Sequence, residues 1–463
     1  MDPNRDALDT AASLPLAAFS DRLTGALVTP DDDAYADARR VWNGMVNEYP
    51  AAVAYCERVE DVSVAVSFAR DHDLDVAVRS GGHSVSGASV VSGGLVVDCS
   101  RLAWVRVDPD NRTARVGAGA DWGLVDRATQ SFGLATPGGV VSETGVAGLT
   151  LGGGTGYLSP KHGFAADNLR AIDVVTGRGE RVTATPERNA DLLWAARGGG
   201  TVGVVTAFEF DLHPLDHDVV YAESWVPAGC AGDVLRTYRT YQETAPDEAC
   251  VSPYFARVPP APEFPTDRHG DLAVVVAGVH AGDPGVGRDE LGELVGGVDA
   301  FATSVDAMPY TELQSMLDDD FPTGRRYYWA AVPLAELHDD AVREARTAAE
   351  RAPSDLSTIV FWPMHGAVGR AAADVGPIAS RDASVVVNVE AAWDDPTATA
   401  ANVEWVRETC RELRGDASLP GTLPNFAGGA APDADDVYAE RAARLRAIRT
   451  RYDPDGVFTY ERG

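Results

Sequence analysis

The segment VAVRSGGHSVSG, Val76 to Gly87, decides how the rest of the chain is arranged. Its first residues alternate between valines and smaller or polar side chains, which predicts a buried strand. Gly81, Gly82 and Gly87 then flank His83, and adjacent glycines let the backbone turn sharply and approach a ligand closely. Successive exposed N–H groups in such a bend form an anion-binding concavity suited to a pyrophosphate. The alternative is a glycine-rich hairpin turn in which the histidine is incidental.

The length and composition of the chain indicate a soluble protein of two or three domains. At 463 residues it is too long for one simple core, and its 45% hydrophobic and 24% charged residues are typical of globular proteins. No stretch approaches the roughly 20 apolar residues of a membrane span. The first 20 residues lack the basic region and apolar core of a signal peptide. We therefore expect a cytoplasmic protein that does not enter a membrane.

The chain is strongly acidic. Its 39 basic and 70 acidic residues give a formal net charge of −31, and Lys161 is its only lysine. An excess of aspartate with arginine in place of lysine indicates adaptation to high salt, because salt screens the repulsion between like charges. The same charge argues against binding to nucleic acid.

The five cysteines lie far apart and show no Cys-x-x-Cys spacing. Buried structural thiols are therefore expected, rather than a metal site or a disulfide framework. They are Cys56, Cys99, Cys230, Cys250 and Cys410.

The periodicity of apolar residues predicts the elements of the first half. A short leading helix is expected within residues 1–30, strands over 50–56 and 94–100, and a helix over 60–71. Residues 113–134 are predicted to form a strand, a glycine turn and a helix, and residues 171–184 a hairpin.

The composition changes after Pro214, where aromatic residues and alternating helix and strand patterns become more frequent. It changes again after Pro420, ahead of an Arg-rich C-terminal helix. The predicted strands are 271–282, 357–366 and 383–393, and the predicted helices are 289–305, 339–352 and a capped helix in 437–458 that ends at Asp453-Pro454.

One formal motif, Gly-x-Gly-x-x-Gly at Gly198, Gly200 and Gly203, matches the dinucleotide fingerprint. That fingerprint requires a strand before it and a helix after it. Here a predicted helix (190–197) precedes the glycines and a predicted strand (204–210) follows them. The order is reversed, which excludes a Rossmann interpretation.

Three glycine-rich loops (79–87, 145–156 and 197–203) lie beside predicted strands in a chain that holds 46 glycines. Repeated close approach of the backbone suggests a long dinucleotide that lies extended across loops. These motifs resemble the FAD-linked oxidases of the vanillyl-alcohol oxidase and p-cresol methylhydroxylase superfamily, in the branch of berberine bridge enzyme, hexose oxidases and 6-hydroxy-D-nicotine oxidase. The supporting stretches are 60–87, 94–102, 116–129, 144–169, 192–200, 202–210 and 451–458, with weaker matches at 308–314 and 323–329.

The resemblance implies an α+β, two-domain fold of the FAD-binding PCMH type, with an antiparallel-sheet substrate domain backed by helices. The FAD-binding domain is expected over residues 1–215 and the substrate domain over 216–415. Residues 416–463 are expected to return to the FAD-binding domain.

The resemblance also implies the cofactor, FAD, and the residues that hold it. The bend would bind the pyrophosphate, and His83 would carry the flavin covalently through its 8α-methyl, a bond that a neutral imidazole is competent to make. The implied cofactor-binding residues are Arg79, Ser80, Gly81, Gly82, His83, Ser84, Gly87, Gly138, Gly139, Gly145, Gly148, Gly153, Gly156, Asn168, Val204, Val205 and Asn425.

Three positions depart from the pattern of the family. Val141 stands where some relatives attach the flavin a second time through a cysteine, so attachment through His83 alone is expected. The loop 197–203 is one residue shorter than in relatives. Leu423 stands where a tyrosine often assists substrate deprotonation, so the base must come from elsewhere or be unnecessary, whereas Asn425 remains a candidate flavin contact.

Four residues of the middle region are the candidates for that base: Tyr327, Tyr328, His365 and Glu390. The two-residue period of a strand places Glu390 on one face with Val386, Asn388 and Ala392, where it could form the polar floor of a pocket. The alternatives are a solvated sheet face for Glu390, a satisfied core or surface histidine for His365, and core aromatics for the two tyrosines.

Lys161 and His162 follow the longest glycine run. A cation near the flavin would stabilise its reduced anion, and the alternative is a surface position for both side chains.

The implied reaction is hydride transfer from a carbon of a small-molecule alcohol, sugar or amine to flavin N5, assisted by a base. Alcohol or sugar hydroxyls are slightly favoured, and reoxidation would be by O₂ or another acceptor. The alternatives are a flavin-binding protein of the same fold whose activity has lapsed, for which Leu423 is the clue, and a nicotinamide-dependent dehydrogenase.

Overall fold

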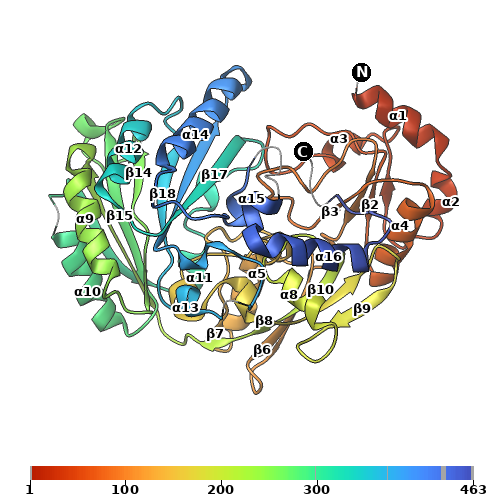
Figure 1. Ribbon diagram of the computed structural model, residues 1–463, viewed down its shortest axis with the longest axis horizontal. Coiled ribbons are helices and arrows are strands. Elements are labelled where there is room, and N and C mark those ends of the chain that lie inside the picture. Colours follow the sequence, from red (N-terminus) through yellow and green to blue (C-terminus); the bar gives the residue numbers. More distant parts are fainter. Residues whose placement is uncertain (1–2, 298, 373, 429–433, 460–463) are drawn as a thin grey trace.

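The computed structural model describes residues 3–297, 299–372, 374–428 and 434–459. Two groups of sheets lie side by side, one built from the N-terminal half and the other from the middle of the chain (Figure 1). None of the described helices is long and apolar enough to cross a bilayer.

The first sheet positions the bend around His83. Its strand order is β1-β2-β4-β3, with β4 parallel to both β2 and β3. Helix α4 connects β2 to β3, and the carboxylate of Asp61 accepts the backbone N–H groups of Glu57 and Arg58 at its start. The elements are α1 (Pro3–Ser13), α2 (Leu16–Ser20), β1 (Leu27–Val28), α3 (Tyr35–Ala38), β2 (Ala52–Tyr55), α4 (Val59–Asp71), β3 (Val76–Arg79) and β4 (Leu95–Asp98).

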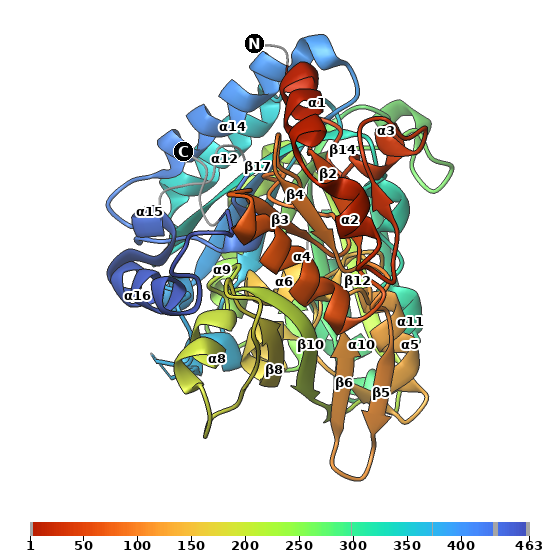
Figure 2. The same cartoon turned by 90° about the vertical axis from the view of Figure 1, so that its right-hand side faces the viewer.

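The second sheet is antiparallel, with the order β5-β6-β10-β8-β9, and lies below the first in Figure 2. Helix α8 precedes the loop 197–203 and strand β10 follows it, which confirms the exclusion of a Rossmann motif. The elements are β5 (Val105–Asp108), β6 (Thr113–Gly117), α5 (Trp122–Gln130), β7 (Leu134–Ala135), α6 (Val146–Leu151), α7 (Ser159–His162), β8 (Leu169–Val175), β9 (Arg181–Ala184), α8 (Ala190–Ala196), β10 (Val204–Asp211) and β11 (His213–Pro214).

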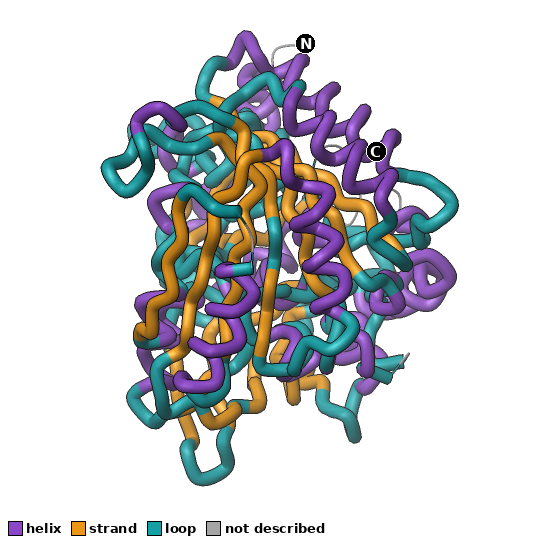
Figure 3. Tube along the Cα trace, turned by 90° about the vertical axis from the view of Figure 1, so that its left-hand side faces the viewer, coloured by secondary structure: helices purple, strands orange, loops and turns teal. Residues whose placement is uncertain are grey.

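The large sheet has the order β16-β12-β15-β14-β18-β19-β17, with β13 paired to β15. Helices α9, α10, α12 and α14 cover one of its faces, and Figure 3 shows helices lying over the strands. The elements are β12 (Val219–Pro227), α9 (Ala231–Gln242), β13 (Ala249–Val251), β14 (Tyr254–Arg257), β15 (Leu272–His280), α10 (Pro284–Gly296), β16 (Ala302–Met308), α11 (Tyr310–Leu313), β17 (Arg326–Leu334), α12 (Asp339–Glu350), β18 (Thr358–Pro363), α13 (Ala367–Arg370), β19 (Val385–Trp393) and α14 (Thr399–Leu413).

The C-terminal segment returns to the first half of the chain. Helix α15 (Ala434–Tyr438) contributes Val437 and helix α16 (Ala442–Tyr452) contributes Leu445 and Ile448 to the core of the two smaller sheets. Phe458 forms a parallel bridge with Val76 at the edge of β3. In Figure 1 the blue α16 accordingly lies among red and yellow elements.

The fold corrects two expectations. The helix predicted over 289–305 ends at Gly296, and its last residues form β16, because the β-branched Thr303 and Val305 favour pairing with β12. The helix predicted in 437–458 is interrupted at Ala439, whose φ of +48° is incompatible with a continuous right-handed helix.

The hydrophobic clusters suggest how the chain divides. One large cluster joins the two smaller sheets with α16, and another lies between the large sheet and its four helices. We propose on this basis the division into residues 1–215 with 416–463, and 216–415. All five cysteines are free thiols; four are buried as the sequence predicts, whereas Cys230 is partly exposed.

Candidate functional site

The bend after β3 is held in place by its side chains, while its backbone stays available. The buried guanidinium of Arg79 donates from Nε to the carboxylate of Asp98, and the hydroxyl of Ser80 donates to the carbonyl of Ala118. Gly82 has a φ of +70°, a conformation that other residues adopt at a cost. Arg79 therefore fixes the bend rather than offering its charge to a ligand.

His83 is half-buried, and its ring stacks on the indole of Trp42 with ring centroids 5.4 Å apart. Burial lowers the pKa of His83 to about 4, with the charge of Asp318 opposing the shift. The imidazole is therefore neutral at pH 7, which is the form in which its nitrogen is nucleophilic.

A second glycine loop approaches the bend closely. A Cβ on Gly81 would lie 2.7 Å from the backbone nitrogen of Gly145, so only glycine fits there. A Cβ on Gly138 would meet the Trp122 ring at 2.7 Å. Gly148 differs, because a Cβ there would meet no atom within 4 Å and the residue is exposed near the start of α6. The two glycine loops thus touch each other, and Gly148 leaves open space beside them near the start of α6. A dinucleotide can cover this surface.

Asn425 organises the remaining part of that loop. Its Oδ1 accepts the N–H of Gly154 at 2.8 Å, and its Nδ2 donates to the carbonyl of Leu149 at 3.2 Å. Gly153 and Gly154 have φ values of +109° and +78°, so the loop depends on glycine here. Asn425 thus anchors the loop from the C-terminal segment.

Three residues expected near the flavin have other contacts. Nδ2 of Asn168 donates to the carbonyls of His162 and Phe164, and its Oδ1 lies 2.6 Å from Nε2 of His213. Val204 and Val205 lie inside the sheet, paired with β8. These side chains support the scaffold.

The face of the large sheet opposite helices α9, α10, α12 and α14 carries the other candidate residues. The register places Trp329, Glu390 and Thr358 side by side on β17, β19 and β18. The next row holds Ala331, Asn388 and Val360, and Trp362 lies beyond it, opposite Val386. Two indoles therefore border a patch of small side chains, and a single carboxyl group lies beside it.

Glu390 is buried rather than on a solvated face. Its carboxylate accepts a hydrogen bond from Thr358 at 2.9 Å and one from Nδ2 of Asn388 at 2.6 Å. Burial raises the pKa of Glu390 to about 7, against the lowering effect of both donors. A carboxyl group that titrates near neutrality can act as a general base.

Several polar atoms of this face lack a partner. The Nε1 atoms of Trp329 and Trp362 and the Oδ1 of Asn388 are buried and have no hydrogen-bond partner among the described residues. Buried polar groups are ordinarily paired, so these atoms can form hydrogen bonds with a ligand at this face. Leu423 and Phe426 pack against the same face and make its surroundings apolar.

The structure separates the other base candidates. Tyr327 lies on the same face as Glu390, and its hydroxyl donates to the carbonyl of Pro322 at 2.9 Å. Tyr328 points to the helix-covered face, where Nε of Arg407 donates to its hydroxyl at 3.1 Å. His365 lies beside Asp247, and burial lowers its pKa.

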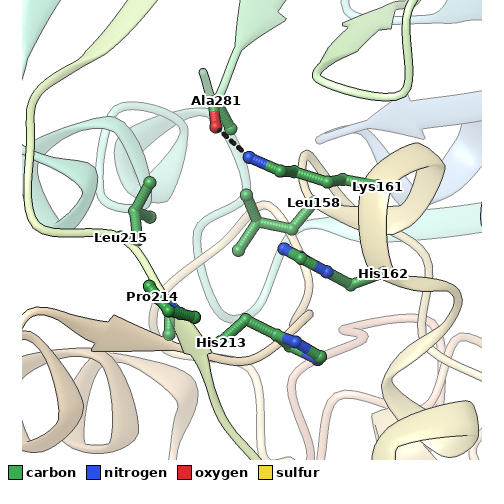
Figure 4. Close-up of a pocket in the computed structure, with 8 residues that line it drawn as sticks. Leu158, Lys161, His162, His213, Pro214, Leu215 and Ala281 are labelled. Atoms are coloured by element: carbon green, nitrogen blue, oxygen red, sulfur yellow. Dashed lines mark hydrogen bonds between the residues drawn. The ribbon is translucent and has the colours of Figure 1, made fainter. Parts of the chain in front are cut away.

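Lys161 and His162 lie where the two halves of the chain meet (Figure 4). Nζ of Lys161 donates to the carbonyl of Ala281 at 2.7 Å, across to the large sheet. The rings of His162 and His213 stack with centroids 3.8 Å apart. This cluster joins the halves at the point where the chain passes from one to the other.

Sequence reasoning missed Trp42 and Asn43. Both are buried, and Asn43 bonds to the bend and to β17 together. In the sequence, both lie in the tetrapeptide VWNG at 41–44, where a tryptophan and an asparagine precede a glycine. This tetrapeptide, ahead of the first predicted strand, is the signal that could have pointed to them.

Comparison with known proteins supports the flavin interpretation. Residues 50–185 match a family model described as an FAD binding domain. The chain is 28% identical to an uncharacterized FAD-linked oxidoreductase (YgaK) of Bacillus subtilis, over 95% of this chain and 96% of the relative. It is 27% identical to the (R)-6-hydroxynicotine oxidase of Paenarthrobacter nicotinovorans, over 95% of this chain and 96% of the relative.

Solved structures share the whole architecture. The BBE-like 1 protein of Physcomitrella patens superposes with a TM-score of 0.86 at 20% identity, covering 96% of this chain and 97% of that one. The xylooligosaccharide oxidase of Myceliophthora thermophila superposes with a TM-score of 0.83 at 21% identity, covering 96% and 98%. The fold is thus that of berberine bridge enzyme-like proteins, with a PCMH-type FAD-binding part.

Proposed function

We propose that this FAD-dependent oxidoreductase oxidises a small, largely apolar alcohol or amine, with Glu390 as the base and with its FAD bonded to His83. The observation that carries the proposal is the buried Glu390 carboxyl on the face of the large sheet opposite helices α9, α10, α12 and α14. Bound FAD would supply the acceptor for a hydride from the substrate carbon.

The residues present fit FAD. The backbone of the bend 79–87 offers N–H groups to a pyrophosphate, and the open space over Gly148 leaves room for a ligand. Asn425 holds the glycine loop next to that space through Gly154 and Leu149. Of the residues expected to touch the cofactor, we retain the bend and the loops at 138–156, and assign Asn168, Val204 and Val205 to the scaffold.

His83 is the nucleophile in the proposed attachment. Its nitrogen would form a bond to the 8α-methyl carbon of bound FAD, with loss of the imidazole N–H and one methyl C–H. Dioxygen would take up the two protons and two electrons and leave as hydrogen peroxide. The low pKa of His83, about 4, keeps the imidazole neutral and ready for this step. Val141 supports attachment at this one site.

Glu390 would remove the proton of the substrate hydroxyl or amine. The hydrogen bonds from Thr358 and Asn388 orient its carboxylate, and its pKa of about 7 suits proton uptake near neutral pH. Leu423 contributes no titratable group, and Glu390 is the carboxyl group that the register places beside the indole of Trp329. Tyr327 borders the site. Tyr328 lies on the helix-covered face and His365 lies beside Asp247, so neither is assigned a role in proton removal.

The walls of this face favour apolar substrates over sugars. Trp329, Trp362, Leu423 and Phe426 surround the patch with aromatic and aliphatic carbon. The indole N–H groups of the two tryptophans can donate to one or two acceptors of a substrate. A sugar would leave most of its hydroxyl groups without partners there.

We also propose a high-salt environment and a cytoplasmic location for the protein. The net charge of −31 with one lysine supports the first of these two proposals. Dioxygen or another electron acceptor would complete the catalytic cycle.

The test is anaerobic mixing of the holoprotein with aromatic alcohols, secondary amines and oligosaccharides, followed by the visible absorption of the flavin. We expect bleaching by aromatic or aliphatic alcohols or amines, and slow or no bleaching by sugars. Glu390→Gln should slow bleaching, whereas Glu408→Gln, on the exposed side of α14, should not. A yellow protein inert to the whole panel would instead support a flavoprotein with lapsed activity.

A further inference from the structure

Trp42 lies between the proposed flavin-attachment residue and the large sheet. Its indole stacks on Tyr327 of β17 with centroids 3.8 Å apart and planes 8° from parallel. On the side of the bend it stacks on His83 at 5.4 Å and 15°. The two stacks place three rings in a nearly parallel row that crosses from one half of the chain to the other.

Hydrogen bonds hold the indole in that position. The backbone N–H of Trp42 donates to the carbonyl of Gly82 in the bend at 3.1 Å. Its Nε1 donates to the carbonyl of Phe321 at 2.8 Å, and its own carbonyl accepts the N–H of Gly324 at 2.8 Å. The ring is 4% exposed, so packing restricts it as well.

Asn43 fixes the same segment to both sides. Its Nδ2 donates to the carbonyl of Val85 in the bend at 2.7 Å and to the carbonyl of Tyr327 at 2.9 Å. Its Oδ1 accepts the N–H groups of Tyr327 and Met45, both at 3.0 Å. All four hydrogen-bonding positions of this fully buried amide are used, two of them on β17 alone.

We infer that Trp42 is a positioning residue for covalent attachment, with Asn43 as its anchor. An imidazole at a half-buried bend has several rotamers, and only those aimed at the methyl carbon lead to a bond. The fixed indole face of Trp42 excludes some rotamers of His83 and keeps the plane of the imidazole ring constant. Holding a nucleophile in a reactive orientation accelerates bond formation strongly. This inference rests on the proposed attachment through His83.

The test measures covalent attachment, not turnover. Apoprotein is incubated with FAD under air, samples are denatured in acid at intervals, and the flavin that stays with the pellet is measured against total flavin. Trp42→Leu keeps an apolar side chain without a ring, and we expect attachment slower by about tenfold or more. Trp42→Phe restores a ring face and should recover most of the wild-type rate.

Two further variants control for folding. Trp225→Leu removes a buried indole that packs on Phe264 in the large sheet, remote from the bend, and should attach flavin at the wild-type rate. Tyr327→Leu removes the ring behind Trp42 and should also slow attachment, which provides a second reading if Trp42→Leu does not fold.

The outcomes separate this inference from the proposed function. Wild-type protein that releases all its flavin in acid would overturn this inference and the attachment through His83, whereas the proposed oxidation would still be decided by the bleaching test. Covalent wild-type protein together with Trp42→Leu and Tyr327→Leu at unchanged rates would overturn the positioning role alone. Slowing in Trp225→Leu equal to that in Trp42→Leu would also overturn it, because the effect would then be one of general stability.

Discussion

The carboxamide of Asn388 donates to the carboxylate of Glu390, two residues along the same strand, at 2.6 Å. Both side chains are buried on a face where the other neighbours are mostly apolar. A carboxylate in that position is stabilised by its few donors, so its titration depends on each of them. The pH dependence of the reaction therefore reports on this pair.

Glu390→Gln should lower kcat by about 10²–10⁴-fold, as expected for the loss of a general base. In the wild type, kcat should fall as the pH falls below about 7, because protonated Glu390 cannot accept a proton. Asn388→Leu removes a donor that lowers the pKa of Glu390, so the acid limb should move to higher pH. Steady-state kinetics from pH 5 to 9 provide the measurement, and an unmoved acid limb in Asn388→Leu would contradict the assignment.

His83→Ala should abolish covalent attachment while FAD binding remains detectable. The bend keeps its shape through Arg79, Asp98 and Ser80, so the pyrophosphate site survives the change. Acid precipitation should give a yellow wild-type pellet and a colourless variant pellet. His217→Ala, at an exposed position, is the matched control and should leave the pellet yellow.

Asn425→Leu should weaken FAD binding without changing the fold. The variant leaves the N–H of Gly154 and the carbonyl of Leu149 without their partner, at a cost of about 1–3 kcal/mol. In a His83→Ala background, where FAD is exchangeable, the Kd for FAD should rise by roughly 5- to 100-fold. Fluorescence titration measures this, with Asn111→Leu in an exposed turn as the control.

The stacked histidines make stability depend on pH. Burial lowers the pKa of His162 to about 3 and also lowers that of His213, while Lys161 opposes protonation of both and Asp247 favours it at His162. Below pH 6.5, the ordinary pKa of histidine, these two rings bind protons in the unfolded chain but not in the folded chain. The free energy of unfolding therefore decreases as the pH falls.

His162→Phe keeps the stack and removes one titrating ring. The proton uptake on unfolding between pH 4.5 and 6.5 should decrease by up to about one proton. Asp126 and Glu390, with pKa values raised to about 7, act in the opposite sense, so the difference between variant and wild type is the quantity to measure. Denaturant unfolding at several pH values provides it, and identical slopes would refute the role of the stack.

Thermal stability should increase with salt. A net charge of −31 creates repulsion within the folded chain. At 0.1 M salt the Debye length is about 10 Å, which leaves part of this repulsion unscreened, whereas at 1 M it is about 3 Å and most of the repulsion is removed. Salt also weakens the exposed ion pairs, but each of them stabilises the fold by less than about 1 kcal/mol. Calorimetry in 0.1 to 2 M KCl should show a rising Tm, and a falling Tm would contradict adaptation to salt.

Local signals in the sequence were sufficient for the elements and the bend. The alternation at β19 and the glycines around His83 predicted the face of Glu390 and the shape of the loop correctly, because both depend on neighbouring residues. The place of β16 was missed, since Thr303 and Val305 pair with a strand about 80 residues earlier. Periodicity within one segment does not show such pairing.

The same reason explains what was missed in the site. The role of Trp42 and Asn43 depends on their contacts with Tyr327, which lies more than 280 residues later in the chain. Tyr328 differs from Tyr327 by one position, and only the register of β17 decides which of them faces the large-sheet helices. Tertiary contacts of this kind are set by the complete fold.

The bridge between Val76 and Phe458 has a consequence for biosynthesis. The strand that leads to His83 completes its outer edge with Phe458, which lies more than 380 residues later in the chain. This edge therefore closes only after the C-terminal segment has been synthesised and has packed against the first half of the chain. A change that displaces that segment would disturb the bend and flavin incorporation before it disturbed the large sheet.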